Sequence, residues 1–165
     1  MTSSRLLCIR LSLIFFVLAL VASRITAFAL PPEVRLLKEW FGPGAPVGER
    51  FPGLADWLLK VSDGLEAADR NWPFLAYGTD WLAFAHLVIA VAFIGPIRDP
   101  VKNVWVVEFG MFACLGVIAL ALVCGPIRGI PWFWRMIDCS FGVFGLIPLA
   151  VAWRMIRATQ TLSRG

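Results

Sequence analysis

The chain has 165 residues, of which 59% are hydrophobic and 16% are charged, and its formal net charge is +4. A soluble domain is about 45–50% apolar and about 25% charged, so this composition excludes an ordinary soluble domain and indicates a membrane protein. The positive charge does not indicate nucleic-acid binding, because the basic residues are spread along the chain and lie mainly at the ends of apolar segments.

The first apolar segment covers residues 11–30 and follows a basic start at Arg5 and Arg10. About 20 apolar residues are enough to span a bilayer, so we favour an uncleaved signal anchor with Arg24 reaching the outer interface. The alternative is a signal peptide, because Ala27 and Ala29 form a small-x-small pattern that permits cleavage after Ala29. Both interpretations place the residues that follow outside the cytoplasm.

The next region, residues 31–78, carries two amphipathic stretches that predict helices outside the membrane. The shorter stretch, Glu33–Phe41, follows a Pro-Pro pair and stops at a Gly-Pro-Gly turn signal. The longer stretch, Leu54–Trp72, repeats apolar residues at helical spacing and ends before a proline. We expect these helices to pack against the outer end of the membrane bundle, and the alternative is that they lie flat on the outer leaflet.

Three further apolar segments are expected to span the bilayer: Thr79–Ile94, Val104–Cys124 and Phe133–Trp153. The first two end at the same four residues, Gly-Pro-Ile-Arg, at 95–98 and 125–128. We interpret both copies as helix stop signals rather than as a true repeat. Glycine permits a left-handed cap, proline blocks continuation, and arginine is favoured at the negative helix end.

The predicted fold class is therefore all-α, a polytopic membrane helix bundle. It has four transmembrane helices, or three if the first segment is a cleaved signal peptide. The expected divisions of the chain are the N-terminal segment, the outer amphipathic region, a three-helix transmembrane core and a basic tail, at 1–30, 31–78, 79–153 and 154–165.

Lysine and arginine predict the orientation, because cytoplasmic loops carry the excess of positive charge. With the N-terminus inside, the basic loop 95–103 and the basic tail 154–165 both fall inside. Tryptophan prefers the headgroup level. The tryptophans expected at the outer boundary are Trp72, Trp81, Trp132 and Trp134, and those expected at the inner boundary are Trp105 and Trp153. Both termini are therefore expected in the cytoplasm.

The apolar run YGTDWLAFAHLVIAVAF, residues 77–93, carries two ionisable groups. Asp80 lies near a predicted helix start, where water and the positive helix end favour a carboxylate. His86 is the only histidine and lies near the middle of its span, where polar groups usually face the bundle interior. It either bonds across a helix contact or handles a proton or a ligand. The two residues lie about 120° apart around the helix, so they do not form a dyad.

Glu108 and Asp138 also lie within one or two turns of predicted helix starts. Asp138 follows Arg135 by three residues, the spacing of an ion pair on one helix face. We expect Glu108 to share the inner layer with Arg98 and Lys102. For all three carboxylates, Asp80 included, we favour a structural interpretation over a functional one.

The last predicted helix places small residues on the same face as Asp138, namely Gly142, Gly145 and Ala152 together with Leu149. Small residues let membrane helices approach closely, so this face is expected to pack inward. Pro148 lies in the same helix and predicts a kink.

Four cysteines occur without a CxxC pair, and with a single histidine they give no zinc-binding pattern. Cys124 and Cys139 flank the short outer loop, where a disulfide would close a loop of about 15 residues. The alternative is that both thiols are free and packed as small hydrophobes, as we expect for Cys114. We expect no cofactor. Haem ligation by His86, alone or paired with its copy in a homodimer, is a less favoured alternative.

Four stretches carry a resemblance to known sequences: YGTDWLAFAH, FIGPIRDPVKN, EFGMFACLGVIALALVCGPIRGIPWFW and IDCSFGVFG. Over residues 73–153 the chain resembles a family of small uncharacterised bacterial integral membrane proteins. The resemblance implies a setting in the bacterial inner membrane and brings no activity with it. The N-terminal third of the chain carries no such stretch.

The sequence shows no nucleotide loop, nucleophile–base pair or metal cluster. We therefore expect a non-enzymatic accessory, assembly or sensing subunit that acts through helix contacts. Its expected partners are lipid and either other membrane proteins or a second copy of the chain. The alternative is a small proton- or ion-coupled transporter subunit that uses His86 with Asp80, Glu108 or Asp138 as a polar track. A membrane enzyme is least favoured, because Glu108 is expected on the side opposite to the other carboxylates.

Overall fold

The computed structural model describes residues 3–28 and 30–162, and within these ranges the chain forms helices and no β-strand. Side chains are described at 3–23, 34 and 36–161. Arg24, Ala27 and Ala29, on which the choice between signal anchor and signal peptide rests, lie outside the described side chains.

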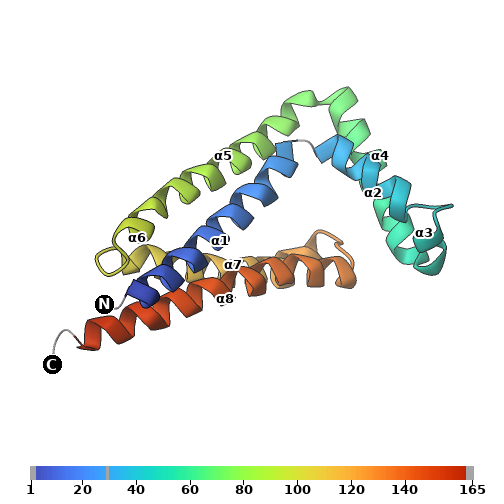
Figure 1. Ribbon diagram of the computed structural model, residues 1–165. Helices are drawn as coiled ribbons and strands as arrows, with labels where there is room; N and C mark the ends of the chain where they lie inside the picture. The colour runs from blue at the N-terminus through green and yellow to red at the C-terminus, as the bar shows by residue number, and fades with distance from the viewer. Residues whose placement is uncertain (1–2, 29, 163–165) are drawn as a thin grey trace. The chain divides into compact units, whose positions relative to one another are not determined.

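Four of the helices are long and apolar enough to cross a membrane (Figure 1). The candidate spans are Ser3–Ser23, Pro73–Arg98, Val104–Ile127 and Trp132–Thr161. They correspond to helix α1 (Ser3–Phe28), helix α5 (Ala76–Ala92) with its flanking turns, helix α7 (Val104–Ile127) and helix α8 (Trp132–Leu162). The predicted all-α fold class with four candidate spans is confirmed.

The second Gly-Pro-Ile-Arg sequence does not stop its helix in the predicted way. Residues 125–127 lie inside the last turn of α7, and the left-handed residue is Gly129, with φ 68°. The Gly129 amide donates to the Pro126 carbonyl at 3.0 Å, and the Ile130 amide donates to the Gly125 carbonyl at 2.9 Å. These two bonds form a Schellman motif, which satisfies the last carbonyls of the helix one turn later than we predicted.

The first copy of this sequence forms a separate short helix, α6 (Ile94–Arg98), after α5 has ended. Its terminal carbonyls accept bonds from a distant arginine in α1. Arg10 donates through Nε to the Ile97 carbonyl at 3.0 Å and through Nη2 to the Arg98 carbonyl at 3.3 Å. A cation at a helix C-terminus satisfies unpaired carbonyls and complements the helix dipole. The predicted role of Arg98 as the capping cation is therefore filled by Arg10.

Helix α8 runs to Leu162, well beyond the predicted end at Trp153. It also passes through Pro148 without ending. Its 31 residues correspond to about 46 Å, and the hydrocarbon core of a bilayer is about 30 Å thick. One end of α8 therefore extends past the apolar layer, where arginine side chains can reach water.

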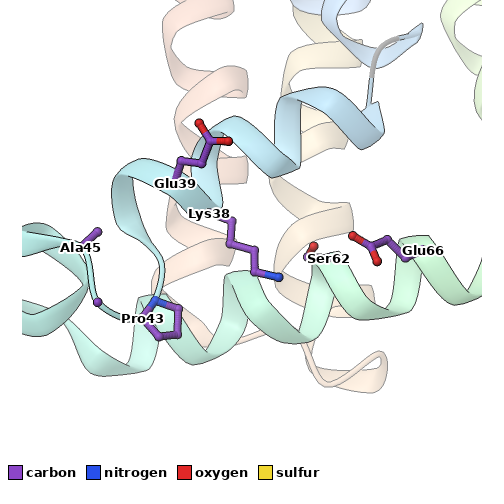
Figure 2. A pocket seen from close by; sticks show the side chains of 7 residues that line it. Lys38, Glu39, Pro43, Ala45, Ser62 and Glu66 are labelled. Atoms are coloured by element: carbon purple, nitrogen blue, oxygen red, sulfur yellow. The ribbon is translucent and has the colours of Figure 1, made fainter.

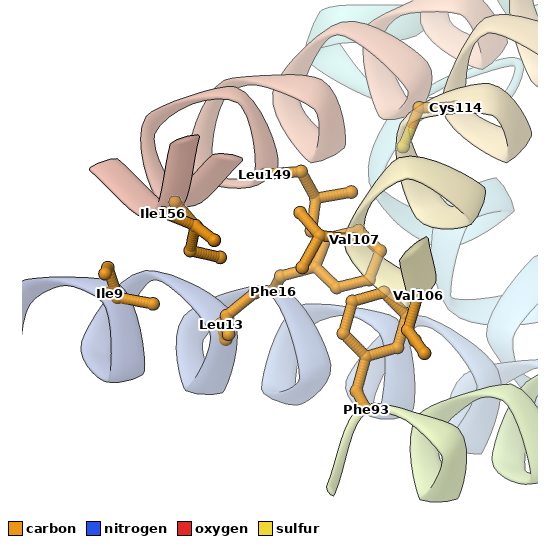
Figure 3. Packing of buried hydrophobic residues seen from close by; sticks show 10 residues of the cluster. Ile9, Leu13, Phe16, Phe93, Val106, Val107, Cys114, Leu149 and Ile156 are labelled. Carbon is orange, nitrogen blue, oxygen red and sulfur yellow. The ribbon is translucent and has the colours of Figure 1, made fainter. Parts of the chain in front are cut away.

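The chain divides into two compact units, each of which is described by itself. The first unit combines Met1–Leu20 with Ile89–Gly165, and we call it the core unit. Its buried cluster draws residues from α1, α7 and α8 together with Phe93, which follows α5 (Figure 3). The Phe16 and Phe93 rings lie 4.9 Å apart between centroids. The fully buried side chains of this cluster are Ile9, Leu13, Phe93, Val107, Leu149, Ala152 and Ile156.

Helices α7 and α8 form the most extensive helix pair of the core unit. The predicted inward face of α8 is confirmed, because Leu149 and Ala152 are fully buried and Gly142 is buried against α7. An added methyl group at Gly142 would lie 2.6 Å from the backbone carbonyl oxygen of Cys114. Glycine is thus required here for the two backbones to approach each other.

The second unit, Val21–Val88, contains a helical hairpin whose helices are not among the candidate spans. Helix α2 (Leu30–Phe41) packs along helix α4 (Pro52–Asn71), and the short helix α3 (Pro46–Arg50) lies in the turn between them. Both predicted amphipathic helices are confirmed, whereas α3 was not predicted. Proline starts both α3 and α4, a position where its missing amide costs nothing.

Candidate functional site

The most connected polar cluster of the core unit forms around Glu108, in the second turn of α7. Two donors from α8 reach the same carboxylate oxygen: Trp153 Nε1 at 2.8 Å and Arg157 Nη2 at 2.5 Å. Trp153 and Arg157 share one helix face because they are four residues apart. The Arg157 guanidinium also lies 5.8 Å from the centre of the Trp153 ring, which supports a cation–π contact. We call these three residues the Glu108 cluster.

The Glu108 cluster adds a partner that our sequence-based expectation did not name, because that expectation placed only Arg98 and Lys102 in the layer of Glu108. Its ion-pair partner is Arg157, which lies in the part of α8 that we had assigned to the tail. Gln160, one turn further on, donates to the carbonyl of Val101 at 3.3 Å. The cluster therefore joins α7 to the end of α8, and both donors bond to Oε1 of the Glu108 carboxylate.

At the start of α8, the predicted ion pair between Arg135 and Asp138 does not form. The Glu108–Arg157 pair is the only ion pair among the described residues. The Arg135 guanidinium instead lies 5.2 Å from the centre of the Trp132 ring, and its methylene groups pack against Gly125. Packing against Gly125 holds Arg135 on α7, and stacking holds its guanidinium on Trp132. The i, i+3 spacing of Arg135 and Asp138 alone therefore did not decide the partner of Arg135.

Two of the predicted carboxylates are too far apart to act together. Glu108 contacts Trp153, and Asp138 lies fifteen positions earlier in the same helix α8. At 1.5 Å per residue, this spacing corresponds to about 22 Å along the helix axis. A shared acid–base site of Glu108 and Asp138 is therefore excluded by the geometry of the core unit.

His86 forms its hydrogen bond within its own helix. Its Nδ1 lies 2.7 Å from the backbone carbonyl of Leu82, one turn earlier in α5. Because a carbonyl only accepts, Nδ1 is the donor in this bond. The predicted bond across a helix contact is replaced by this local bond. Asp80, near the start of α5, is exposed and forms no ion pair among the described residues.

Comparisons with known protein families, with curated proteins and with solved structures gave no match. The function is therefore argued from the residues and their contacts. Within the described ranges, no group of three or more histidine, cysteine, aspartate or glutamate side chains lies close enough to hold a metal ion. Of the two alternatives for Cys124 and Cys139, a disulfide or free thiols, the structure has free thiols, and Cys114 lies in the buried cluster.

Substitution of His86 by leucine is expected to change the free energy of unfolding by less than about 1 kcal/mol. In an α-helix the Leu82 carbonyl also accepts the backbone amide of His86, so this carbonyl stays paired when the imidazole is removed. Unfolding of the purified variant by SDS titration, followed by tryptophan fluorescence, measures the change. A loss of several kcal/mol would show that the imidazole makes a tertiary contact that stabilises the fold.

The sequence did not reveal the partners of Glu108, because Trp153 and Arg157 lie more than forty residues away from it. It also gave no weight to Lys38 and Ser62, which lie on the packing faces of α2 and α4. The sequence does single out both residues, because each occupies a helical position where the pattern of its helix predicts an apolar side chain.

Proposed function

We propose that this chain is a non-enzymatic subunit of the bacterial inner membrane that acts through helix contacts in an accessory, assembly or sensing role. The observation that carries this proposal is the exposure of its spans. In the most apolar 18-residue stretch of each span, only 17–28% of the residues are buried within the chain. Phe112 of α7 and Phe144 of α8 are 78% and 68% exposed. Such faces are available to lipid and to neighbouring membrane helices.

The polar groups within the spans support a structural rather than a catalytic use. The Glu108 carboxylate is bonded to two side chains of α8, and His86 is bonded to its own helix. The alternative, a proton- or ion-coupled transporter subunit, would depend on the free Nε2 of His86, because Glu108 is already paired with Arg157. We favour the contact role for this reason.

We further propose that both termini lie in the cytoplasm. The support is the basic residues Arg98 and Lys102 within residues 95–103, and the arginines in the C-terminal part of α8. An alkaline phosphatase fused after Gly165 is expected to be inactive in bacterial cells, whereas green fluorescent protein fused at the same position should fluoresce. The opposite pair of results would reverse the orientation.

Site-specific photo-crosslinking in native membranes tests the proposed contact role. A benzophenone amino acid at Phe112 or at Phe144 should give a discrete adduct with another protein or with a second copy of the chain. The matched control is the same probe at Phe93, which is fully buried and should react only within the chain. If the probes at Phe112 and Phe144 crosslink to lipid alone, these faces are not protein contacts and the proposal fails.

A further inference from the structure

The hairpin of α2 and α4 carries a surface pocket of about 490 Å³ that is more open than enclosed, and we call it the hairpin cavity (Figure 2). It is lined by the end of α2, by the turn at residues 43–45 and by the middle of α4. Small-molecule sites in proteins typically measure about 300–1,000 Å³, so the cavity has the size of a ligand site. All of its lining belongs to the second unit, so its shape does not depend on the core unit.

The residues that line the cavity break the apolar pattern of their helices. Val34 is buried on the face of α2 that packs on α4, and Lys38 follows it by four residues on the same face. On α4 the buried positions are Ala55, Leu58 and Ser62. Ser62 is 2% exposed and is the only buried polar residue among the described side chains. A lysine and a serine thus occupy positions where a purely structural hairpin would carry apolar side chains.

The charged side chains of the cavity are not joined to each other by ion pairs within the described ranges. The Lys38 side chain extends from α2 toward Ser62, and Glu66 lies one turn beyond Ser62 on α4 (Figure 2). Glu39 also contributes to the lining. Within the described ranges no ion pair joins Lys38 to Glu39 or to Glu66. The cavity therefore presents the Lys38 ammonium and the Glu66 carboxylate to a ligand, whereas the Glu39 side chain points away from Ser62 and α4 (Figure 2).

We propose that this cavity binds a small zwitterionic amino compound. The ligand carboxylate is placed at the Lys38 ammonium and the Ser62 hydroxyl, and the ligand ammonium is placed at the Glu66 carboxylate. Because the lining holds one cation and two anions, it favours a ligand with a second positive charge, so a basic amino acid fits better than a neutral or an acidic one. This proposal concerns the hairpin alone and does not depend on the proposed role of the membrane helices.

Isothermal titration of the purified full-length chain in detergent tests the site with three probes: L-lysine, L-alanine and L-glutamate. Binding is expected in the order lysine, alanine, glutamate. The variants Lys38→Met and Glu66→Gln should each weaken lysine binding about tenfold or more, the effect of losing one hydrogen bond to a charged group. The matched controls Lys102→Met and Glu49→Gln lie outside the lining and should bind lysine as the wild type does.

The proposal is overturned if the wild type binds none of the three probes at millimolar concentration, or if it binds L-glutamate as tightly as L-lysine. Equal binding by wild type and Lys38→Met would also overturn it, because the carboxylate would then not be held by Lys38. Each variant is compared with the wild type in thermal unfolding first. If a variant fails to fold, the order of the three probes on the wild type decides the question.

Discussion

Replacing Gly142 with alanine is expected to lower the free energy of unfolding by about 1–3 kcal/mol, the usual cost of overpacking a close contact. The new methyl group would lie 2.6 Å from the Cys114 carbonyl oxygen and 2.7 Å from the Ile118 side chain. The carbonyl belongs to the backbone of α7 and cannot turn aside, so α7 and α8 would have to separate. SDS titration followed by tryptophan fluorescence measures the loss.

Gly116→Ala is the matched control for this prediction. Gly116 lies in α7, and a methyl group added there would meet no atom within 4 Å. Alanine is favoured over glycine in a helix by up to about 1 kcal/mol, so this variant should be as stable as the wild type or slightly more stable. Equal destabilisation by the two substitutions would contradict the close approach of α7 and α8 at Gly142.

Replacing Glu108 with leucine is expected to destabilise the chain by about 1–2 kcal/mol. The substitution removes one ion pair and the bond from Trp153, which together join α7 to α8. The effect is limited because the Glu108 and Arg157 side chains are 40% and 48% exposed, so solvent screens their attraction. The same SDS titration measures the effect.

Asp80→Leu is the matched control, because Asp80 is also a carboxylate near the start of an apolar helix but forms no ion pair among the described residues. It should unfold like the wild type. A double-mutant cycle between Glu108→Leu and Arg157→Leu should give a coupling energy of at least about 0.5 kcal/mol. Additive effects of these two substitutions would show that the pair contributes nothing to stability.

The local parts of the fold could be predicted because they depend on local patterns. Apolar runs long enough to span a bilayer predicted the four long helices, and helical spacing of apolar residues predicted α2 and α4. The small-residue face of α8 predicted that Gly142 packs inward, and the structure supplies α7 as the partner. In each case the determining residues lie within one helix, so their effect can be read along the chain.

The ends of the helices were predicted less well. The residue that caps or extends a helix end either lies one turn further along the chain or makes its contact with a residue far away in the sequence. We placed the left-handed cap at Gly125, but the structure places it at Gly129. We ended the last helix at Trp153, since arginines follow it, but Arg157 continues the helix and bonds to Glu108. A basic residue after an apolar run therefore marks the edge of the apolar layer rather than the end of the helix.

The sequence by itself determined the class of this protein, its four apolar spans and the positions of its ionisable residues, because hydropathy and helical periodicity are local properties of the chain. The tertiary structure alone decided which of those residues meet. It paired Glu108 with Trp153 and Arg157, held Arg135 against Gly125 instead of Asp138, and placed Lys38 beside Ser62 in the hairpin cavity. Such contacts depend on how helices are packed in space, and spacing along the chain shows which face of a helix packs but not which residues of another helix it meets.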